Sequence, residues 1–325
     1  MYFFIFFIIL NLIIFYKYEL FCKLINIYDL PDKKRRIHKF KIPLTGGIIF
    51  FINIIFLFIL YNNNFEDLGV FENKSQFYLF IFSCVFIFLI GLLDDKLNIS
   101  ANKKLLLLIF ILSFILYFDK DVNISFARLS FMDFKFQFGN FSFLWTIVCF
   151  LLFVNAFNML DGINLQSGFY SFILILVFLY LKLSYLFFIY LLFPTILFLY
   201  LNFKNKSFLG NSGSYLLPYI FSYFFIKNYN YNDYLYADLI VLVMIIPGLD
   251  LIRLFFLRII DKRNPFSADN NHLHHILLKR KGYFKTLIII QSIIILPVIL
   301  GIYLENSLIA LSISFVLYIY FLFKK

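Results

Sequence analysis

The chain has 325 residues, of which 63% are hydrophobic and only 14% are charged, and its mean hydropathy is +0.90. Soluble globular domains do not reach these values, so the composition indicates a polytopic membrane protein, which we treat as a single membrane-embedded domain spanning residues 1–325. The three cysteines fall in or beside apolar runs, which argues against a disulfide framework and against a zinc site with paired ligands. The first apolar run lacks a basic start and a cleavage site, so we expect it to be a retained span.

A hydrocarbon core takes about 20 apolar residues per helical crossing, and the chain offers many such runs separated by short polar joints. The sequence therefore predicts an all-α polytopic integral membrane protein with about eleven transmembrane helices. In chain order, the expected spans are residues 2–20, 43–61, 76–93, 103–118, 141–156, 167–182, 184–201, 211–226, 235–257, 284–303 and 306–323.

Lys182 interrupts the apolar stretch 169–201, which fits either two short crossings or one long tilted crossing. Lys and Arg favour the cytoplasmic side in short loops. With two crossings and an external N-terminus, 23 of the 29 Lys and Arg residues are cytoplasmic, whereas a single crossing removes the bias. We therefore expect two crossings, an external N-terminus and a cytoplasmic C-terminus. This orientation accounts for the net charge of +11, so a nucleic-acid partner is unnecessary.

Five polar segments fall on the predicted cytoplasmic face, at residues 28–47, 91–104, 155–164, 205–214 and 265–282. The predicted external loops have no comparable density of Asp, Asn, His and Gly, and polar residues are expected to stop near the cytoplasmic ends of the spans. The convergence of these segments predicts a site that takes a water-soluble substrate from the cytoplasm.

Asp94 and Asp95 end the third expected span, beside Lys96. A solvated helix end is the structural interpretation of this pair. The functional interpretation is that carboxylates at the membrane surface bind Mg²⁺ or accept a proton, because ionisable residues are costly in this position.

Four polar residues recur at steps of three in the next segment: Asn155, Asn158, Asp161 and Asn164. On a helix they would form one slowly drifting stripe. Such a stripe serves either as helix-packing hydrogen bonds or as oxygen ligands for Mg²⁺ and sugar hydroxyls.

The stretch "FLGNSGS" places Gly210, Asn211 and Ser212 at the beginning of the eighth expected span. Small residues here allow close helix contact, and free backbone N–H groups at a helix N-terminus also bind phosphate. The stretch by itself does not decide between these interpretations.

Three of the four histidines, His272, His274 and His275, lie in one basic segment that begins near Arg263. We interpret this segment as an anion cradle, in which an Arg side chain and imidazoles bind a diphosphate. A solvated basic loop and a zinc site are the alternatives, the latter disfavoured because no Cys accompanies the histidines.

Three further residues are expected to contribute to substrate binding. Arg36 and His38 lie on the first predicted cytoplasmic loop and could serve the same anion or a lipid phosphate. Asp250 lies inside the ninth expected span, with Arg253 three residues later. A helix-internal ion pair explains Asp250 structurally, and substrate contact is the second interpretation.

Five motifs in this order resemble the polyprenyl-phosphate N-acetylhexosamine-1-phosphate transferase family of the MraY/WecA type. They are "RRIHK…P…GG", "GLLDD", "NAFNMLDG", "FLG-x-SGS" and "PF…D…HLHH", and they extend from about residue 28 to 282. The "HLHH" form and the eleven expected spans are similar to the surface-polysaccharide branch of the family.

The resemblance implies Mg²⁺-dependent transfer, with Mn²⁺ as a substitute, of a sugar-1-phosphate from a UDP-N-acetylhexosamine to undecaprenyl phosphate. UMP is released, and the lipid-linked product initiates a cell-envelope polysaccharide. The implied location is the bacterial cytoplasmic membrane with the site facing the cytoplasm, and homodimers occur in the family.

The residue patterns and the resemblance together give the candidate site residues. The expected catalytic residues are Asp94, Asp95 and Asp161. The expected metal ligands are Asn158, Asp161 and Asn211. The expected substrate-binding residues are Arg36, His38, Asn155, Asn158, Asn164, Gly210, Ser212, Asp250, Arg263, His272, His274 and His275.

Two positions depart from the family pattern. The family usually has Asp where this sequence has Asn211, and Asp is frequent where it has Asn164. An Asn at position 211 still offers a carbonyl oxygen but removes a negative charge, which predicts weaker metal binding and leaves a catalytically weakened homologue as an alternative.

Two further alternatives belong to other functions. A transporter or flippase would carry polar residues through the bilayer to both faces and would show repeats between its halves, and neither feature is evident in the sequence. A peptidoglycan-branch enzyme would act on a UDP-muramyl-pentapeptide, but its histidine loop differs from "HLHH".

Overall fold

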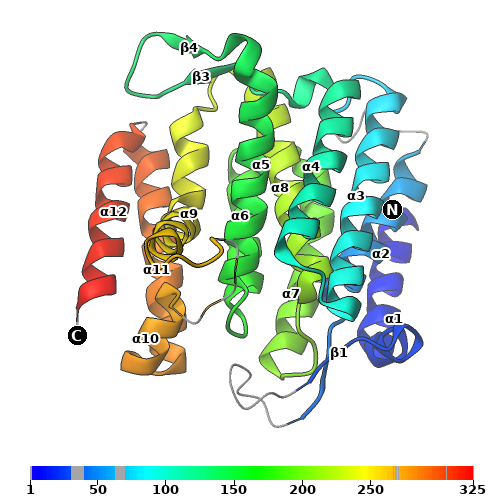
Figure 1. The fold of residues 1–325 in the computed structure, drawn as a ribbon. Helices are drawn as coiled ribbons and strands as arrows, with labels where there is room; N and C mark the ends of the chain where they lie inside the picture. Colours follow the sequence, from blue (N-terminus) through cyan, green and yellow to red (C-terminus); the bar gives the residue numbers. More distant parts are fainter. Residues whose placement is uncertain are drawn as a thin grey trace.

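The computed structural model describes residues 2–30, 40–62, 70–265, 267, 269, 271–304 and 306–324. Twelve helices are present in this part of the chain (Figure 1). They are α1 (Tyr2–Ile25), α2 (Gly46–Tyr61), α3 (Lys74–Leu97), α4 (Ala101–Phe118), α5 (Ser142–Leu160), α6 (Gln166–Tyr180), α7 (Tyr185–Phe203), α8 (Gly210–Tyr231), α9 (Ala237–Ile260), α10 (Leu273–Lys281), α11 (Tyr283–Leu304) and α12 (Ser307–Phe323).

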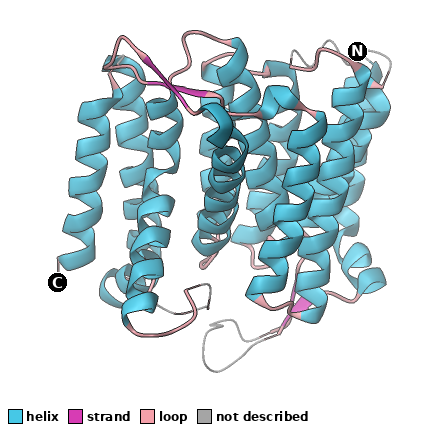
Figure 2. Ribbon diagram, turned by 45° about the horizontal axis from the view of Figure 1, so that its top comes forward, coloured by secondary structure: helices cyan, strands magenta, loops and turns pink. Residues whose placement is uncertain are grey.

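Two short antiparallel hairpins accompany the helices. Strand β1 (Tyr28–Asp29) pairs with β2 (Ile42–Pro43), and β3 (Phe126–Arg128) pairs with β4 (Lys135–Gln137). Figure 2 shows the two hairpins at opposite ends of the helix bundle. The β1–β2 hairpin lies at the same end of the bundle as α10, and the β3–β4 hairpin lies at the opposite end (Figure 1).

Every expected span corresponds to one helix, and α10 is an additional short helix within the histidine segment. The prediction of an all-helical membrane protein is therefore confirmed. By length and composition, seven of the described helices can cross a membrane, and three shorter apolar ones accompany them, namely α2, α6 and α12. Eleven crossings and their orientation remain predictions.

Lys182 does separate two helices, as the charge pattern predicts. Helix α6 ends at Tyr180 and α7 begins at Tyr185. Lys182 and Ser184 adopt left-handed backbone conformations, with φ of 53° and 45°, and this reverses the chain within four residues. The stretch 169–201 is therefore not one long helix.

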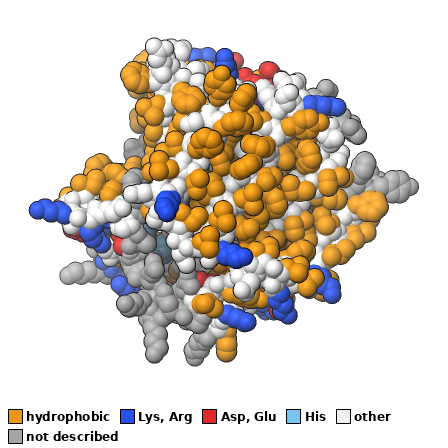
Figure 3. Space-filling view, turned by 45° about the vertical axis from the view of Figure 1, so that its right-hand side comes forward, with side chains coloured by type: hydrophobic (Ala, Val, Ile, Leu, Met, Phe, Trp, Pro, Cys, Tyr) orange, Lys and Arg blue, Asp and Glu red, His pale blue; other side chains and the backbone are white. Residues whose placement is uncertain are grey.

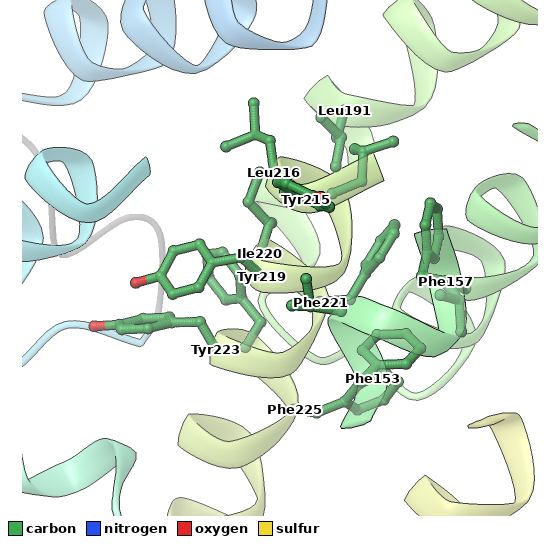
Figure 4. Close-up of a cluster of buried hydrophobic side chains, with 14 of the residues drawn as sticks. Phe153, Phe157, Leu191, Tyr215, Leu216, Tyr219, Ile220, Phe221, Tyr223 and Phe225 are labelled. Atoms are coloured by element: carbon green, nitrogen blue, oxygen red, sulfur yellow. The ribbon is translucent and has the colours of Figure 1, made fainter. Parts of the chain in front are cut away.

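Helix α8 is the centre of the bundle. Eighteen of its 22 residues are buried, and it packs against α2, α3 and α5. In Figure 4 the rings of Tyr219 and Tyr223 project to one side of this helix, away from Phe153 and Phe157 of α5. A helix that is surrounded by other helices needs less lipid-compatible surface, which explains why α8 carries more polar residues than the other long helices.

Close approach of α2 and α3 to α8 depends on glycine. A Cβ atom at Gly91 would lie 2.5 Å from Cα of Ser212, and one at Gly47 would lie 2.4 Å from the backbone nitrogen of Gly213. The small residues of "FLGNSGS" therefore do allow close helix contact, as one of the two sequence interpretations proposes.

The outer surface of the bundle is apolar. Figure 3 shows a broad band of hydrophobic side chains, with most of the charged side chains above and below it. Large exposed apolar residues occur on many helices, and α1 and α12 expose Phe6, Ile13, Phe315 and Val316 by more than half. Such a surface is expected of a protein whose solvent is the hydrocarbon core of a membrane.

Candidate functional site

A cavity of about 2060 Å³ opens at the end of the bundle that carries β1 and α10. Most of the predicted site residues line it together: Asp95, Asn155, Asn158, Asp161, Asn164, Gly210, Asn211, His272, His274 and His275. They come from four of the five polar segments, and the fifth segment lines the same cavity through Tyr28, Asp29 and Lys41. The predicted convergence of these segments is therefore confirmed for the described residues. Arg36 and His38 lie outside the described residues.

Asp95 joins α3 to the N-terminus of α8. Its carboxylate accepts backbone hydrogen bonds from Asn211, at 2.7 Å, and from Ser212, at 3.0 Å. Gly210 has φ +74°, and a Cβ atom there would approach Asp95 Oδ2 to 2.9 Å. Because a carboxylate already caps these N–H groups, the interpretation of this helix end as a free phosphate site is wrong in this structure. The hydroxyl of Ser212 is buried and does not line the cavity.

Asp94 is buried behind the cavity wall. Its carboxylate accepts hydrogen bonds from Lys104 Nζ at 2.7 Å, from the Tyr215 hydroxyl at 3.0 Å and from the backbone of Ile99 at 2.9 Å. Lys104 and Tyr215 line the cavity themselves. The aspartate pair is thus not a solvated helix end: Asp94 fixes a lysine ammonium at the cavity, and Asp95 fixes α8.

Asp161 ends helix α5 and lies beside the cavity. Ser167 donates a hydrogen bond to its carboxylate, and the Asn158 amide oxygen accepts one from Ser214 at 2.7 Å. Desolvation, together with the negative charges of Asp95 and Asp29, raises the pKa of Asp161 to about 7. Carboxylates that repel one another in this way are suited to share a cation.

The donor set fits a magnesium ion better than a transition metal. Among the described residues, no group of three or more His, Cys, Asp or Glu side chains is arranged to hold a metal. Magnesium typically takes one or two carboxylates, waters and substrate phosphates. The carboxylates of Asp95 and Asp161 and the amide oxygens of Asn158 and Asn211 all border the cavity and provide such a set.

The expected stripe of four polar residues on one helix is wrong, because α5 ends at Leu160. Asn155 and Asn158 lie on the helix, whereas Asp161 is its C-cap and Asn164 lies in the following turn. Asn155 donates to the backbone oxygen of Leu151 at 2.7 Å.

Asn164 connects loops at the mouth of the cavity. Its side chain donates to Asn205 and exchanges a hydrogen bond with Asn202, and its backbone oxygen accepts from the Tyr283 hydroxyl at 2.9 Å. The residue therefore holds the turn after α5 against the turn after α7. This position accounts structurally for an Asn here.

The histidine segment packs directly on the turn after α5. A Cβ atom at Gly162 would lie 2.0 Å from His274 Nε2, so only glycine leaves room for this ring. Burial, followed by repulsion from the other histidines, lowers the pKa of His274 well below its usual range, and similar causes lower that of His275 to about 4. Both imidazoles are therefore neutral at pH 7 and offer N–H donors rather than positive charges.

Asp250 holds the beginning of α10. Its carboxylate accepts hydrogen bonds from His272 Nδ1 at 3.1 Å and from the backbone of Leu273 at 3.2 Å, and it pairs with Arg253 at 2.8 Å. The helix-internal ion pair predicted from the sequence is thus present. Asp250 itself does not line the large cavity, so it reaches the cavity through His272.

Arg263 is not among the residues that line the cavity. It pairs with Asp261 at 2.7 Å on the exposed surface. Arg258, five residues earlier, lines the cavity instead and pairs with Asp269 at 2.9 Å. The sequence pointed to Arg263 because it lies in the basic segment, whereas Arg258 lies in the last turn of an apolar helix and was overlooked.

Sequence reasoning also missed Asp29, Lys104 and Tyr215, all of which border the cavity. Asp29 lies on β1 and is close enough for its charge to act on Asp161. Lys104 lies in the first turns of α4, ten residues after Asp94. The only sequence signal for these residues was their position at the predicted cytoplasmic ends of spans.

One wall of the cavity is apolar. It is formed by side chains of α4, α5 and α9, namely Leu105, Leu108, Val148, Leu151, Leu152, Leu251, Ile252, Phe255 and Phe256. Pro247 lies inside α9, and in Figure 1 the second part of this helix is seen nearly end-on while its first part stands upright. The cavity therefore combines polar lining residues with an apolar wall.

The expectation that polar residues stop near one end of the spans is wrong for α8. Tyr219 bonds Ser83, and the Tyr223 hydroxyl donates to Asp119 at 2.7 Å. Lys227, fully buried, lies 3.2 Å from Asp119 near the opposite end. These polar side chains of α8 bond one another or neighbouring helices and are surrounded by packed aromatic rings. They therefore serve helix packing and give no support to a transport path.

Comparison with known proteins gives one consistent result. Residues 77–228 match the model of "Glycosyl transferase family 4". Undecaprenyl-phosphate alpha-N-acetylglucosaminyl 1-phosphate transferase of Thermotoga maritima is 28% identical over 285 residues, covering 87% of this chain and 84% of the relative. Enzymes of the same name from Escherichia coli K12 and Yersinia pestis are 24% and 23% identical, covering 79% and 78% of this chain and 70% of each relative.

Proposed function

Since the chain belongs to glycosyl transferase family 4, we propose that it transfers GlcNAc-1-phosphate from UDP-GlcNAc to undecaprenyl phosphate. An oxygen of the lipid phosphate attacks the β-phosphorus of the nucleotide sugar. The bond from that phosphorus to the bridging oxygen breaks, and the electron pair leaves with UMP. The other product is undecaprenyl diphosphate-GlcNAc.

The two-sided cavity is the observation that carries this proposal. Its polar lining residues suit a nucleotide sugar, and its apolar wall on α4, α5 and α9 suits the polyprenyl chain of an acceptor that lies in the membrane. A volume of about 2060 Å³ exceeds what one small ligand needs. The cavity can therefore bring a water-soluble donor and a lipid acceptor together.

Lys104 and Asp94 are well placed to orient the lipid phosphate. Lys104 lines the cavity, as do Leu105 and Leu108 of the apolar wall. Its 2.7 Å contact with Asp94 fixes the direction of this long side chain. A fixed positive charge at that place binds the acceptor phosphate and lessens its repulsion from the donor diphosphate.

Magnesium is the proposed cofactor, with Mn²⁺ as a substitute. Asp95, Asp161, Asn158 and Asn211 would hold the ion, which when bound neutralises charge on the diphosphate. Asn211 contributes no negative charge, so we expect this site to depend on the donor diphosphate for part of its affinity. Asp161 must lose its proton before it can serve as a ligand.

The histidine segment would bind the donor diphosphate. His272, His274 and His275 line the cavity, and the last two are neutral at pH 7. A neutral imidazole donates a hydrogen bond to the diphosphate but adds no positive charge. The donor is therefore held without binding the product UMP so tightly that its release is slowed. Arg258 supplies a permanent positive charge to the same wall.

We also propose that the cavity faces the cytoplasm of a bacterial cell. The basic residues Lys279, Arg280 and Lys281 of α10 lie at the cavity end of the bundle, as the predominance of Lys and Arg on the cytoplasmic side requires. UDP-sugars are made in the cytoplasm, so this orientation supplies the donor directly.

The test is UMP release by the purified protein in detergent, with undecaprenyl phosphate, a panel of UDP-N-acetylhexosamines and a Mg²⁺ titration. An Asn211→Asp variant is included because it adds a negative charge at the metal site. We expect lipid-dependent release with UDP-GlcNAc that is lost with EDTA and in Asp94→Asn, and a lower Mg²⁺ requirement in Asn211→Asp.

Release with another UDP-sugar, including UDP-muramyl-pentapeptide, would assign a different donor. No release from any donor, even in the Asn211→Asp variant, would overturn the transferase proposal. In that case lipid transport assays in vesicles become the next experiment.

A further inference from the structure

The carboxylate of Asp250 gathers donors from three helices. It accepts from His272 Nδ1 and the Leu273 backbone of the α10 segment, from Arg253 on its own helix α9, and from the hydroxyl of Tyr318 on α12 at 2.9 Å. Because an ionised carboxylate only accepts, the His272 Nδ1 atom must carry the proton in this contact. Asp250 thereby determines which face of His272 is turned to the cavity.

Tyr318 is an integral part of this group. Its side chain is 2% exposed, and its hydroxyl donates to Asp250 Oδ1 while accepting from Arg253 Nε at 2.8 Å. Arg253 also donates to the backbone oxygen of Asn271 at 2.6 Å. The tyrosine hydroxyl is therefore connected to the histidine segment by two routes, through Asp250 and through Arg253.

The other end of α10 is also held by α12. Arg280, in the last turn of α10, donates hydrogen bonds to the backbone oxygens of Leu322 and Lys324 at 3.0 and 2.9 Å. Since α12 packs against α9 and α11, it is a fixed support for the short helix. Both ends of α10 are thus tied to the final helix of the chain.

We propose that α12 positions the histidine segment for the donor diphosphate, and that Tyr318 is a positioning residue that acts on His272 through Asp250. This inference rests on the proposed function for the identity of the ligand. Tyr318 satisfies one oxygen of Asp250 and leaves the other for His272. Without the Tyr318 hydroxyl, Arg253 and the Asp250 carboxylate lose the partner that they share. The carboxylate is then free to turn, and the His272 ring that it holds loses its fixed orientation.

The first test needs no enzymatic activity. His272 reactivity toward diethyl pyrocarbonate is measured by peptide mass spectrometry in the wild-type protein, in Tyr318→Phe and in Tyr320→Phe. Tyr320 lies on the same helix but is 47% exposed and does not contact Asp250, so it is the matched control. We expect faster labelling of His272 in Tyr318→Phe, up to about tenfold because a hydrogen bond to a charged group is lost, and wild-type labelling in Tyr320→Phe. Equal labelling in all three proteins would overturn the inference.

The second test separates positioning from general stability. In Tyr318→Phe the KM for UDP-GlcNAc is expected to rise about tenfold while the KM for undecaprenyl phosphate stays unchanged. In an Asp250→Asn background the same substitution should add little, because both changes act through one contact. A parallel rise of both KM values with a lower unfolding temperature would indicate a merely structural role and contradict the proposal. If the wild-type protein itself releases no UMP, the proposed function fails, and the labelling experiment still decides the inference.

Discussion

Lys104 Nζ lies 2.7 Å from Asp94 Oδ2, and the Asp94 side chain is only 2% exposed. Removing the lysine would leave a buried carboxylate with neutral partners alone. We expect Lys104→Met to lower the free energy of unfolding by about 3 kcal/mol, since breaking a buried pair leaves an uncompensated charge. Thermal unfolding in detergent measures this change.

The same variant is expected to lose UMP release by at least about a hundredfold, because the proposed anchor for the lipid phosphate is gone. Lys103→Met is the matched control: Lys103 is the preceding residue and is exposed, so both stability and activity should stay near wild type. If the two variants behave alike, Lys104 has no special role.

Gly162 provides a purely steric test of the histidine segment. A methyl group at this position would lie 2.0 Å from His274 Nε2, and the His274 ring is 2% exposed and cannot turn into solvent. We expect Gly162→Ala to reduce kcat/KM for UDP-GlcNAc by about tenfold or more, because a small misplacement of a binding group is costly. Steady-state UMP release measures the effect.

Gly248→Ala is the control for this substitution. A Cβ atom at Gly248 meets no atom within 4 Å, so the same chemical change should leave kcat/KM unaltered. Wild-type kinetics in Gly162→Ala would show that the ring of His274 is not needed at its present position.

The helices were predictable because bilayer thickness sets the length of an apolar run, and the loop charges resolved the one ambiguous run at Lys182. Helix α10 was not predictable in this way. It has nine residues, it is basic, and its beginning depends on Asp250, which is more than twenty residues away in the sequence. Local sequence does not encode such a cap.

The site was predictable as a convergence of polar segments, but the partners of its residues were not. Asp95 bonds the backbone of Asn211 from a position 116 residues earlier, and Asp94 bonds Tyr215 across 121 residues. Such pairs follow from the crossing of α3 and α8 that Gly91 permits. The predicted helical stripe was also too long, because the spacing of polar residues by three continues through Asp161 and Asn164 although α5 ends at Leu160.

The ion pair between Lys227 and Asp119 should affect stability without affecting the site. Both side chains are fully buried, and their charged atoms are 3.2 Å apart. Lys227 lies near the C-terminal end of α8, whereas Gly210 and Asn211 at the other end of this helix line the cavity. We expect Lys227→Met to destabilise the protein by about 3 kcal/mol while the KM values of the folded fraction stay unchanged. Thermal unfolding and UMP release measure the two quantities.

Lys120→Met serves as the control for Lys227, because Lys120 is exposed beside the same cluster. Its unfolding temperature should remain near that of the wild-type protein. A raised KM for either substrate in Lys227→Met would contradict the assignment of this pair to helix packing, and would show that the two ends of α8 are coupled.

His275 gives the protein a defined response to acid. Burial and the neighbouring His272 lower the pKa of His275 to about 4 in the folded state, against an ordinary value of 6.5. Between these two values the unfolded chain binds the proton and the folded chain does not, so stability is fully present above pH 6.5 and decreases as the pH falls toward 4.

A glutamine at this position cannot titrate. We therefore expect the unfolding temperature of the wild-type protein to fall more steeply between pH 7 and pH 5 than that of His275→Gln, as followed by thermal unfolding in detergent. Parallel curves for the two proteins would mean that His275 does not change its charge on unfolding in this range, and that its neutrality in the folded site is wrong.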